Sequence, residues 1–339
     1  MSTRQGVAVL GATGVVGQRL ISMLDGHPWF EVAELISSRA AGKLYRDAVS
    51  WVAPGAVPEA AGAMKLIEAG TNLGSRIVFS ALGAEVARDV EPRYAAAGHM
   101  VISNASAFRT DPAVPLVIPE VNPHSLALLD QQQFATAGGG IVTNPNCTAV
   151  GLTLALAPLA QNFGIKAATV VTMQALSGAG LAALDDPDLQ GNVVPFIHNE
   201  EDKIAAEPLK ILEAEFPISV SANRVPVTEG HMMTVFVKLG MASGERAVAD
   251  TMEAFRAPER VASLPSSPAQ PIILAKDRDH PQPRMDKETG DGMSVVVGPV
   301  QPDPVYDARF TVLVHNLVRG AAGAALLNAE LVHATRTPA

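Results

Sequence analysis

The chain is poor in cysteine, in aromatic residues and in positive charge. Of its 339 residues one is cysteine, 4% are aromatic, and 25 Lys and Arg stand against 34 Asp and Glu. A single cysteine excludes a disulfide framework and a CxxC metal site. The net charge of −9 disfavours a nucleic-acid partner, which would need a basic face.

Long hydrophobic runs are missing as well. No apolar segment approaches the ~20 residues of a membrane helix. The opening residues, MSTRQGVAVLGATG, lack the pattern of a signal peptide, in which a charged stretch precedes a long apolar run. We therefore expect a cytoplasmic protein with no membrane partner. A length of 339 residues, 48% of them hydrophobic, favours two domains.

The pattern of apolar segments changes near residue 147. Before it, the run VAVL, a glycine turn, a helical stretch and the run VAELI form a βαβ unit of about 30 residues. The strand-like runs RIVFSAL and HMVISNAS follow, which predicts a parallel sheet. After it, KAATVVTMQAL, HMMTVFVKLG and FTVLVHNLV are strand-like with few helices between them. We expect an α/β protein: a Rossmann-type, parallel-sheet nucleotide domain plus an α+β domain with a mixed sheet.

The turn GATGVVG spaces its glycines as GxxGxxG between the first strand and the first helix. Glycines allow a tight turn and a close approach of the backbone to a pyrophosphate, which then lies at the helix N-terminus. A tight loop that binds nothing is the alternative. The predicted cofactor-binding residues of this turn are Gly11, Thr13, Gly14, Val15 and Val16.

The end of the second strand bears on the choice of cofactor. An Asp or Glu there would bind the ribose hydroxyl of NAD. This chain instead has Ser37, Ser38 and Arg39, which favours the 2′-phosphate of NADP. Arg39 and Lys43 could also be solvated surface charges. We expect Ser38 and Arg39 to bind NADP.

Cys147 stands between the residues TNPN and the helix-forming run TAVGLTLAL. If a helix begins just after Asn146, Cys147 lies in its first turn. Backbone N–H groups and the helix dipole there stabilise a thiolate and lower the thiol pKa from about 8.5. A lone cysteine is often a small buried hydrophobe. Its position here favours a nucleophile.

Five segments of the sequence resemble one family. SNASAFR, NPNCT, QALSGAG, RVPVTEGHMMTV and HNLVRGAAGAALLNAELV are similar to segments of aspartate-semialdehyde dehydrogenases, and most closely to the archaeal and fungal branch. The resemblance extends from Gly11 to about Glu330. It implies reversible NADP-dependent conversion of L-4-aspartyl phosphate to L-aspartate 4-semialdehyde through a cysteine thioester, in the biosynthesis of lysine, threonine and methionine.

The resemblance also implies a domain organisation. It places an NADP-binding domain at residues 1–146, joined by a C-terminal helix at 316–339. A catalytic and dimerisation domain then covers residues 147–315. The expected partners are the small-molecule substrate, phosphate and further copies of the chain, as a homodimer or homotetramer.

Catalytic roles follow from the same resemblance. Cys147 would be the nucleophile and Gln174, in QALSGAG, would position the intermediate. His231, in EGHMM, would be the general acid/base, and an imidazole with a pKa near ~6.5 suits that task. A lone histidine is more often structural, so the catalytic assignment of His231 rests on its motif.

The substrate carries a phosphate, a carboxylate and an ammonium group, and the resemblance assigns side chains to each. Arg109, in NASAFR, would bind phosphate, and guanidinium suits bidentate recognition of anions. Arg224 would hold the carboxylate. Glu200 would face the ammonium and Lys203 the phosphate, although Glu-x-x-Lys is also an ordinary helical surface pair. Glu201 could replace Glu200.

Further residues extend the predicted site. Ser177, Gly178 and Asn316 would meet the nicotinamide side of the cofactor. Asn104 lies at the end of a strand, where the cofactor crevice should open, and Asn146 could donate to a developing oxyanion. For Asn104 and Asn146, turn chemistry is the alternative explanation.

Other enzymes with the same Cys/His chemistry stay open as alternatives. The chain has LAALDDPDLQG after SGAG, where the family has a Tyr-Pro type of turn, and Met173 where a tyrosine often stands. An N-acetyl-glutamyl-phosphate reductase or a malonyl-CoA (acyl-CoA) reductase would leave Glu200 without a cation to bind.

A nucleotide-binding scaffold without catalysis is a further alternative. It should lack the nucleophile, the base or the anion clamps, yet the chain has Cys147, His231, Arg109 and Arg224. We expect no metal, because no His/Cys/carboxylate cluster has ligand spacing.

Overall fold

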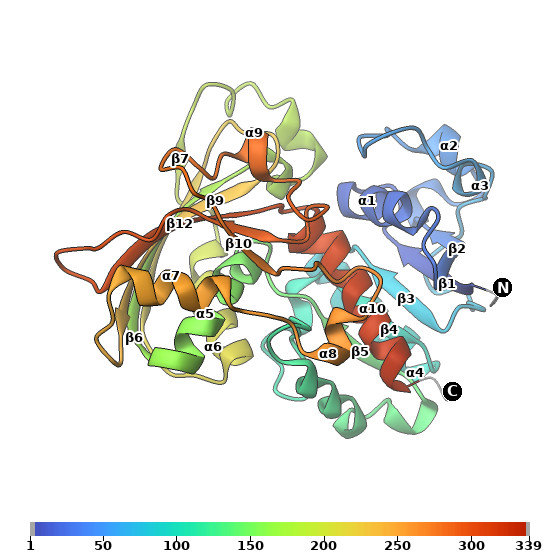
Figure 1. The fold of residues 1–339 in the computed structure, drawn as a ribbon. Coiled ribbons are helices and arrows are strands. Elements are labelled where there is room, and N and C mark those ends of the chain that lie inside the picture. Colours follow the sequence, from blue (N-terminus) through green and yellow to red (C-terminus); the bar gives the residue numbers. More distant parts are fainter. Residues whose placement is uncertain (1–3, 337–339) are drawn as a thin grey trace. The chain divides into compact units, whose positions relative to one another are not determined.

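The computed structural model describes residues 4–336, which form two compact units (Figure 1). The first unit contains residues 4–117, 123–145 and 321–336, and the second contains residues 118–122 and 146–320. Residues 1–3 of the predicted nucleotide domain and 337–339 of the predicted C-terminal helix lie outside the described residues.

The first unit is built on a parallel sheet of five strands in the order β2-β1-β3-β4-β5. Every residue of the last three of these strands is buried, which explains their unbroken apolar character. The strands are β1 (Gln5–Leu10), β2 (Phe30–Ile36), β3 (Ile77–Ser80), β4 (Met100–Ser103) and β5 (Gly140–Thr143).

Three longer helices belong to this unit: α1 (Val15–Leu24), α4 (Ala84–Ala96) and α10 (Gly323–Arg336). Although α10 ends the chain, it contacts β4 and α1, as Figure 1 shows. Its residues up to Val332 are buried, so it is part of the core of the first unit. Two single-turn helices, α2 (Tyr45–Ala48) and α3 (Glu59–Gly62), lie between β2 and β3.

The second unit is built on a mixed sheet of seven strands in the order β10-β11-β12-β9-β6-β8-β7. The pairs β6–β8 and β10–β11 are parallel and the others are antiparallel. Its strands are β6 (Ile165–Gln174), β7 (Val194–Pro195), β8 (Ile218–Arg224), β9 (His231–Leu239), β10 (Ile272–Leu274), β11 (Val295–Val297) and β12 (Ala308–Val314). The predicted fold class, a Rossmann-type parallel sheet plus an α+β unit with a mixed sheet, is confirmed.

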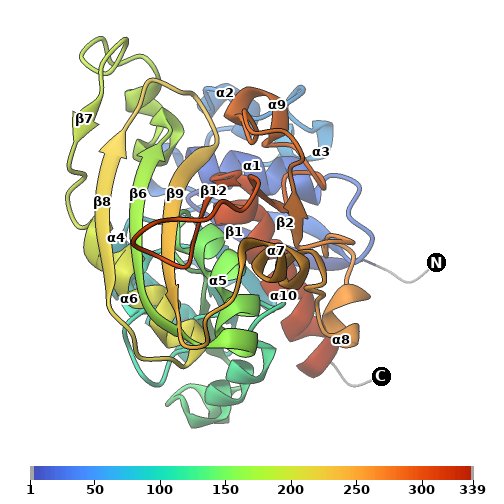
Figure 2. The same cartoon turned by 60° about the vertical axis from the view of Figure 1, so that its left-hand side comes forward.

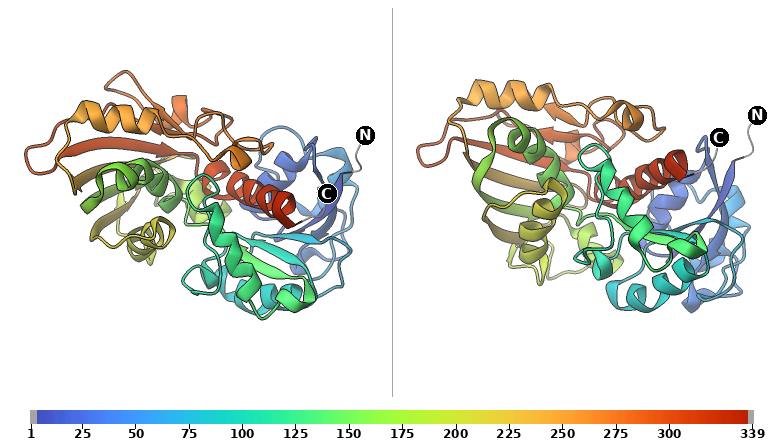
Figure 3. Two further views of the ribbon diagram at one scale, coloured as in Figure 1. Left: turned by 60° about the horizontal axis from the view of Figure 1, so that its bottom comes forward. Right: turned by 90° about the horizontal axis from the view of Figure 1, so that it is seen from below.

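One face of the mixed sheet is packed against helices. The helices α5 (Ala149–Phe163) and α6 (Glu200–Leu212) lie on the same side of it, and α5 also contacts α7 (Glu245–Glu253) (Figures 2 and 3). A Cβ at Gly151 of α5 would lie 2.9 Å from Cβ of Val314, so a glycine is needed where α5 meets β12. The single-turn helices α8 (Glu259–Ala262) and α9 (Pro283–Asp286) complete the unit.

Residues on the opposite face of this sheet are more exposed. In β9, and in β6 from Ala168 onward, buried side chains alternate with partly or fully exposed ones. Val171, Met173, Met232 and Phe236 are among the side chains on the less buried side. Among residues 4–336, every helix is too short or too polar to cross a membrane.

Candidate active site

The glycine turn of the first unit is packed too closely for side chains. Gly11 has a φ of +76°, and a Cβ there would lie 2.7 Å from the carbonyl oxygen of Ala81. A Cβ at Gly17 would lie 2.3 Å from the carbonyl oxygen of Gly11, so α1 contacts the turn directly. Gly14 is the N-cap of α1 and provides no side-chain cap, and the first turn of α1 has no acidic residue. This is a cradle suited to a pyrophosphate.

Thr13 and the residues after β2 lie next to one another. Thr13 Oγ1 and Ser37 Oγ are 3.3 Å apart, and Ser38 and Arg39 form a short 3-10 helix with Ala40. Glu34 is engaged elsewhere, because its carboxylate accepts hydrogen bonds from the amides of residues 74 and 75. The Glu34 carboxylate is therefore not available at the end of β2, where Ser38 and Arg39 follow the strand.

Asn104 and Arg109 are linked at the carboxyl end of β4. Nη2 of Arg109 donates to the carbonyl oxygen of Asn104 at 2.7 Å. The Asn104 amide donates to the carbonyl oxygen of Ser80, and its oxygen accepts a bond from Asn144 at 3.1 Å. Asn144 in turn accepts a bond from Asn328 of α10 at 2.6 Å. The sequence analysis missed Asn144 and Asn328, whose pairing needs the folded chain.

In the second unit, Asn146 caps the helix that follows the cysteine. Its Oδ1 accepts hydrogen bonds from the amides of Thr148 and Ala149, and its carbonyl oxygen accepts one from the amide of Val150. The regular part of α5 begins at Ala149, but the bond from the Val150 amide to the Asn146 carbonyl oxygen is already of helical type, so Cys147 lies in the opening turn of the helix, as the sequence predicts. Cys147 occupies the turn that leads into the helix, because the Asn146 side chain satisfies the first free amides.

Cys147 lies beside His231, the first residue of β9. The Sγ–Nε2 distance is 3.3 Å, and the ring is completely buried. Its Nδ1 accepts a hydrogen bond from the amide of Ala175 at 3.0 Å. Burial and, after it, the positive charges of Arg224 and His315 lower the pKa of His231 to about 3. The imidazole is therefore neutral near pH 7.

Gln174 and Arg224 are neighbours because β6 and β8 pair in parallel, with these two residues in register. Nη1 of Arg224 donates to the carbonyl oxygen of Ala175 at 2.7 Å. A Cβ at Gly178 would lie 2.9 Å from Nε2 of His231 and 3.0 Å from Nη1 of Arg224. Any larger residue at Gly178 would push these two side chains apart.

Glu200, in the first turn of α6, is surrounded by donors. Its carboxylate accepts bonds from Lys203 at 3.0 Å, Asn146 at 2.9 Å and Gln174 at 3.3 Å. Burial acts to raise the pKa of Glu200, but the charge of Lys203 and these hydrogen bonds outweigh it and lower the pKa. Glu201 instead accepts a bond from the amide of Ala222. The geometry thus separates the two candidates and favours Glu200.

Two groups were missed by sequence reasoning, one on α6 and one in the π-helix Val318–Ala322. Glu207 is buried and accepts a hydrogen bond from the amide of Asn146. It lies seven residues after Glu200, on the same helix face, so helical periodicity was the available signal. A Cβ at Gly320 would lie 2.7 Å from Cβ of Cys147, which fixes a glycine beside the nucleophile.

Asn316 joins two segments of the candidate site. Its Oδ1 accepts from the amide of Gly230 at 2.8 Å, and its Nδ2 donates to Ser177 Oγ at 2.8 Å. Because Gly230 precedes His231, this bond helps to place the start of β9. These two bonds connect Ser177 through Asn316 to Gly230, the residue before His231.

The predicted site residues fall into two sets. Gly11, Thr13, Gly14, Val15, Val16, Ser38, Arg39, Asn104 and Arg109 belong to the first unit, and Asn146, Cys147, Gln174, Ser177, Gly178, Glu200, Lys203, Arg224, His231 and Asn316 belong to the second.

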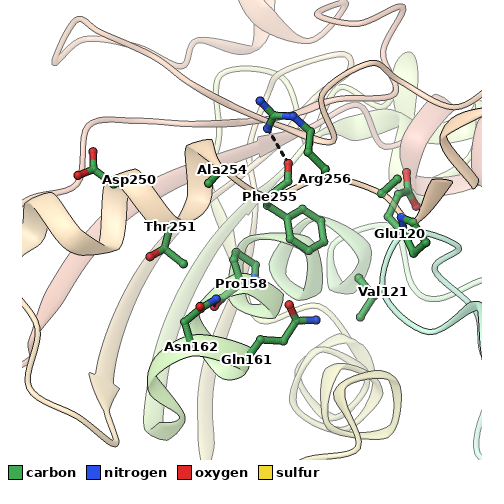
Figure 4. A pocket seen from close by; sticks show the side chains of 12 residues that line it. Glu120, Val121, Pro158, Gln161, Asn162, Asp250, Thr251, Ala254, Phe255 and Arg256 are labelled. Carbon is green, nitrogen blue, oxygen red and sulfur yellow. Dashed lines mark hydrogen bonds between the residues drawn. The ribbon is translucent and has the colours of Figure 1, made fainter.

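A separate cavity of about 640 Å³ opens between α5, α7 and the residues that follow α7 (Figure 4). Gln161, Asn162 and Phe255 line it, and Arg256 donates a hydrogen bond to the carbonyl oxygen of Phe255. The lining residues include none of the predicted site residues.

A parallel-sheet unit with a glycine cradle, in one chain with a partly buried cysteine beside a buried histidine, is typical of a nicotinamide-dependent dehydrogenase with a thiol nucleophile. Residues 6–129 match the family model described as "Semialdehyde dehydrogenase, NAD binding domain", and residues 156–319 match "Semialdehyde dehydrogenase, dimerisation domain". The chain belongs to the semialdehyde dehydrogenase family and, within it, to the aspartate-semialdehyde dehydrogenases.

The relatives come from the branch that the sequence motifs indicated. The chain is 44% identical to the aspartate-semialdehyde dehydrogenase of Archaeoglobus fulgidus, over 97% of this chain and 98% of that protein. It is 40% identical to the Cryptococcus neoformans enzyme, over 96% of each chain. The resemblance to the archaeal and fungal branch is confirmed.

Solved structures agree with this assignment. The aspartate-semialdehyde dehydrogenase of Candida albicans with NADP has a TM-score of 0.88 and 36% identity, covering 98% of this chain and 99% of that one. The Vibrio cholerae aspartate-semialdehyde dehydrogenase II complexed with ASA has a TM-score of 0.79 and 27% identity, covering 98% of each.

Proposed function

We propose that this chain is an NADP-dependent aspartate-semialdehyde dehydrogenase, which reversibly converts L-4-aspartyl phosphate to L-aspartate 4-semialdehyde with release of phosphate. The observation that carries this proposal is the 3.3 Å contact between Cys147 Sγ and His231 Nε2, with Arg224 and Glu200 in the same unit. The name shared by the archaeal and fungal relatives supports it.

The charges of the second unit suit an amino-acid substrate. Glu200 is held ionised by Lys203, Asn146 and Gln174, and an anion is what an α-ammonium group requires. Arg224 offers a guanidinium for the α-carboxylate. Lys203, and Arg109 of the first unit, would bind phosphate.

The thiolate of Cys147 would attack the acyl carbon, and phosphate would leave with the electron pair of the broken C–O bond. NADPH, when bound, supplies the hydride that reduces the resulting thioester. Gln174, beside Glu200, would hold the substrate above the sulfur.

The first unit would bind NADP. At Gly11 and Gly17 its cradle has no room for a side chain, which fits a pyrophosphate at the start of α1. Ser38 and Arg39 would bind the 2′-phosphate. The presence of NADP in the Candida albicans structure supports this choice. The predicted domain of residues 1–146 and 316–339 would thus bind NADP. The predicted domain of residues 147–315 would carry out catalysis and dimerisation.

A homodimer would form through the less buried face of the second unit's sheet. Val171, Met173, Met232 and Phe236 on β6 and β9 give that face an apolar character, and the matched model describes a dimerisation domain. Light scattering should give at least a dimer. Phe236→Asp should shift the protein toward monomer, whereas Val86→Asp on the exposed side of α4 should not.

A cytoplasmic location belongs to the same proposal, because a protein with one cysteine has no need of an oxidising compartment. The biosynthetic role, toward lysine, threonine and methionine, follows from the proposed reaction.

The test is NADP reduction with L-aspartate 4-semialdehyde, measured with and without phosphate. The rate should require phosphate and vanish in Cys147→Ala. NADPH oxidation by malonyl-CoA without any rate on the semialdehyde would instead point to an acyl-CoA reductase. Activity on an N-acetylated substrate alone would point to an N-acetyl-glutamyl-phosphate reductase, for which the ionised Glu200 has no partner.

A further inference from the structure

The carbonyl groups of the glycine turn are all bonded within the protein. Each of the four carbonyl oxygens of residues 11–14 accepts a hydrogen bond, the first and the last from main-chain amides at 3.0 and 2.9 Å. The two central ones are bound by side chains. The carbonyl oxygen of Ala12 accepts from the Tyr45 hydroxyl at 2.9 Å, and that of Thr13 accepts from Nε2 of Gln18 at 3.0 Å. The main chain of the turn is thus held by two donors from outside it.

Gln18 makes further hydrogen bonds that fix the direction of its amide. Nε2 also donates to the carbonyl oxygen of Ser50 at 3.0 Å, and Oε1 accepts from the amide of Val52 at 2.7 Å. A reversed amide would direct its oxygen at two carbonyl oxygens and its nitrogen at an N–H group, so only one orientation satisfies the partners. Because the side chain is completely buried, it joins Thr13 firmly to the segment 50–52.

Tyr45, the first residue of α2, binds the neighbouring carbonyl group. Its side chain is completely buried, and burial raises the pKa of its hydroxyl well above the ordinary value. The hydroxyl therefore keeps its proton and stays a donor to Ala12. The ring lies edge to face against that of Trp51, with the centroids 6.4 Å apart. The segment 45–52 thus supports the turn at two points, directly through Tyr45 and by way of Gln18.

These bonds determine what the turn offers to an anion. A pyrophosphate is attracted by N–H groups and repelled by carbonyl oxygens. The amides of Val15 and Val16, in the first turn of α1, have no acceptor within the helix, and Gly14 provides no side-chain cap. A carbonyl group of the turn that rotated toward the same space would oppose the anion. Donors that bind the carbonyl oxygens of Ala12 and Thr13 prevent such a rotation.

We propose that Gln18 and Tyr45 are positioning residues of the cofactor site, which hold the carbonyl groups of Thr13 and Ala12 so that the turn presents its amides to the pyrophosphate of NADP. Both residues act through the main chain of the turn. The proposal rests on the proposed function, of which NADP binding by the first unit is one part.

Two conservative substitutions remove these donors. Tyr45→Phe deletes the hydroxyl alone, and Gln18→Met replaces the amide with an apolar chain of similar length. Gln132→Met is the matched control for Gln18→Met, because Gln132 is also buried in the first unit and bonds both main-chain groups of Ile141 at 2.8 Å. Tyr94→Phe is the control for Tyr45→Phe, because the buried Tyr94 hydroxyl accepts from a loop amide outside the turn.

Calorimetric titration of the protein with two ligands tests the proposal. One is NADP, and the other is adenosine 2′-monophosphate, which carries the 2′-phosphate but no pyrophosphate. Gln18→Met and Tyr45→Phe should each raise Kd for NADP by about 3- to 10-fold, the range expected for one hydrogen bond, and should leave Kd for adenosine 2′-monophosphate within about twofold. Both control variants should bind the two ligands as the native protein does.

Two results would overturn the proposal. One is an unchanged Kd for NADP in the folded variants, and the other is an equal rise in Kd for both ligands, which would mean a general disturbance of the first unit. If Gln18→Met does not fold, Tyr45→Phe decides. The titrations omit the substrate, so inactivity toward aspartate semialdehyde would overturn the proposed reaction and leave these results intact. A native protein that binds neither ligand would overturn both proposals.

Discussion

Arg319 holds Glu120 in a bidentate ion pair, with Nη1–Oε1 at 2.6 Å and Nη2–Oε2 at 2.7 Å, and both side chains are buried. The pair attaches residues 118–122 to the second unit. Arg319 directly precedes Gly320, whose backbone lies against Cys147. The ion pair therefore fixes the segment beside the nucleophile.

Removal of one partner of this pair should be costly. Glu120→Ala leaves a buried guanidinium without its counter-charge, and we expect a loss of about 3–5 kcal/mol in the free energy of unfolding. The double variant Glu120→Met/Arg319→Met should recover much of that loss. Urea unfolding measures both. Asp250→Ala, which breaks the exposed pair with Arg246, is the control and should have no measurable effect. Equal stability of Glu120→Ala, the double variant and Asp250→Ala would contradict a stabilising role for the Arg319–Glu120 ion pair.

Gly320→Ala should disturb the nucleophile directly. The new Cβ would lie 2.7 Å from Cβ and 3.0 Å from Cα of Cys147, so the cysteine must move. A shift of about 1 Å in a reacting group can lower kcat by about 100-fold. Gly244→Ala is the matched control, since a Cβ there meets nothing within 4 Å. Steady-state kinetics should separate the two, and an unchanged kcat in Gly320→Ala would show that the cysteine tolerates the displacement.

Glu200→Gln and Glu201→Gln should differ sharply. Glu200 is bonded to Lys203, Asn146 and Gln174, whereas Glu201 is bonded to the amide of Ala222. A hydrogen bond to a charged group contributes about 1.5–3 kcal/mol, so Glu200→Gln should lower kcat/KM for aspartate semialdehyde by about 10- to 100-fold. Glu201→Gln should leave it within about twofold. The reverse order would assign the ammonium to Glu201.

The buried His231 should make the protein sensitive to acid. Its pKa is lowered to about 3 in the folded chain, while an unfolded histidine has a pKa of about 6.5. Between these values the unfolded state binds a proton that the folded state does not, so stability falls as the pH falls below about 6.5. From pH 7 to pH 5 this amounts to about 2 kcal/mol.

His231→Gln should remove that contribution. Urea unfolding at pH 7 and pH 5 should show a smaller loss in the variant than in the native protein. His198→Gln, at an exposed position, is the control and should keep the native pH dependence. A variant as acid-sensitive as the native protein would mean that other groups cause the effect.

Arg39 should decide between the two nicotinamide cofactors. Arg39→Ala should raise KM for NADPH by about 10- to 100-fold, the range expected for a charge-assisted bond to phosphate, and should leave KM for NADH unchanged. Lys43→Ala tests whether a surface charge nearby has the same effect. If both variants bind NADPH as the native protein does, Arg39 is a solvated charge.

The sequence by itself determined the kind of protein and many of its local elements. Buried strands such as β3 and β4 are continuous apolar runs. The glycines at 11 and 17 stand out in the sequence because the packed backbone leaves no room there for a Cβ. The motifs around Cys147 and around His231 identified the family, because each motif is a continuous stretch of the chain. Local pattern and residue chemistry sufficed for these points.

Only the tertiary structure decided which atoms meet. That Asn146 caps α5 through its side chain depends on the direction of that side chain, which the sequence does not give. The choice of Glu200 over Glu201 depends on donors from three different segments, and the contact of Gly320 with Cys147 joins residues far apart in the chain. The His231 ring accepts a hydrogen bond from a backbone amide 56 residues away, and no sequence pattern records a hydrogen bond made by a main-chain group.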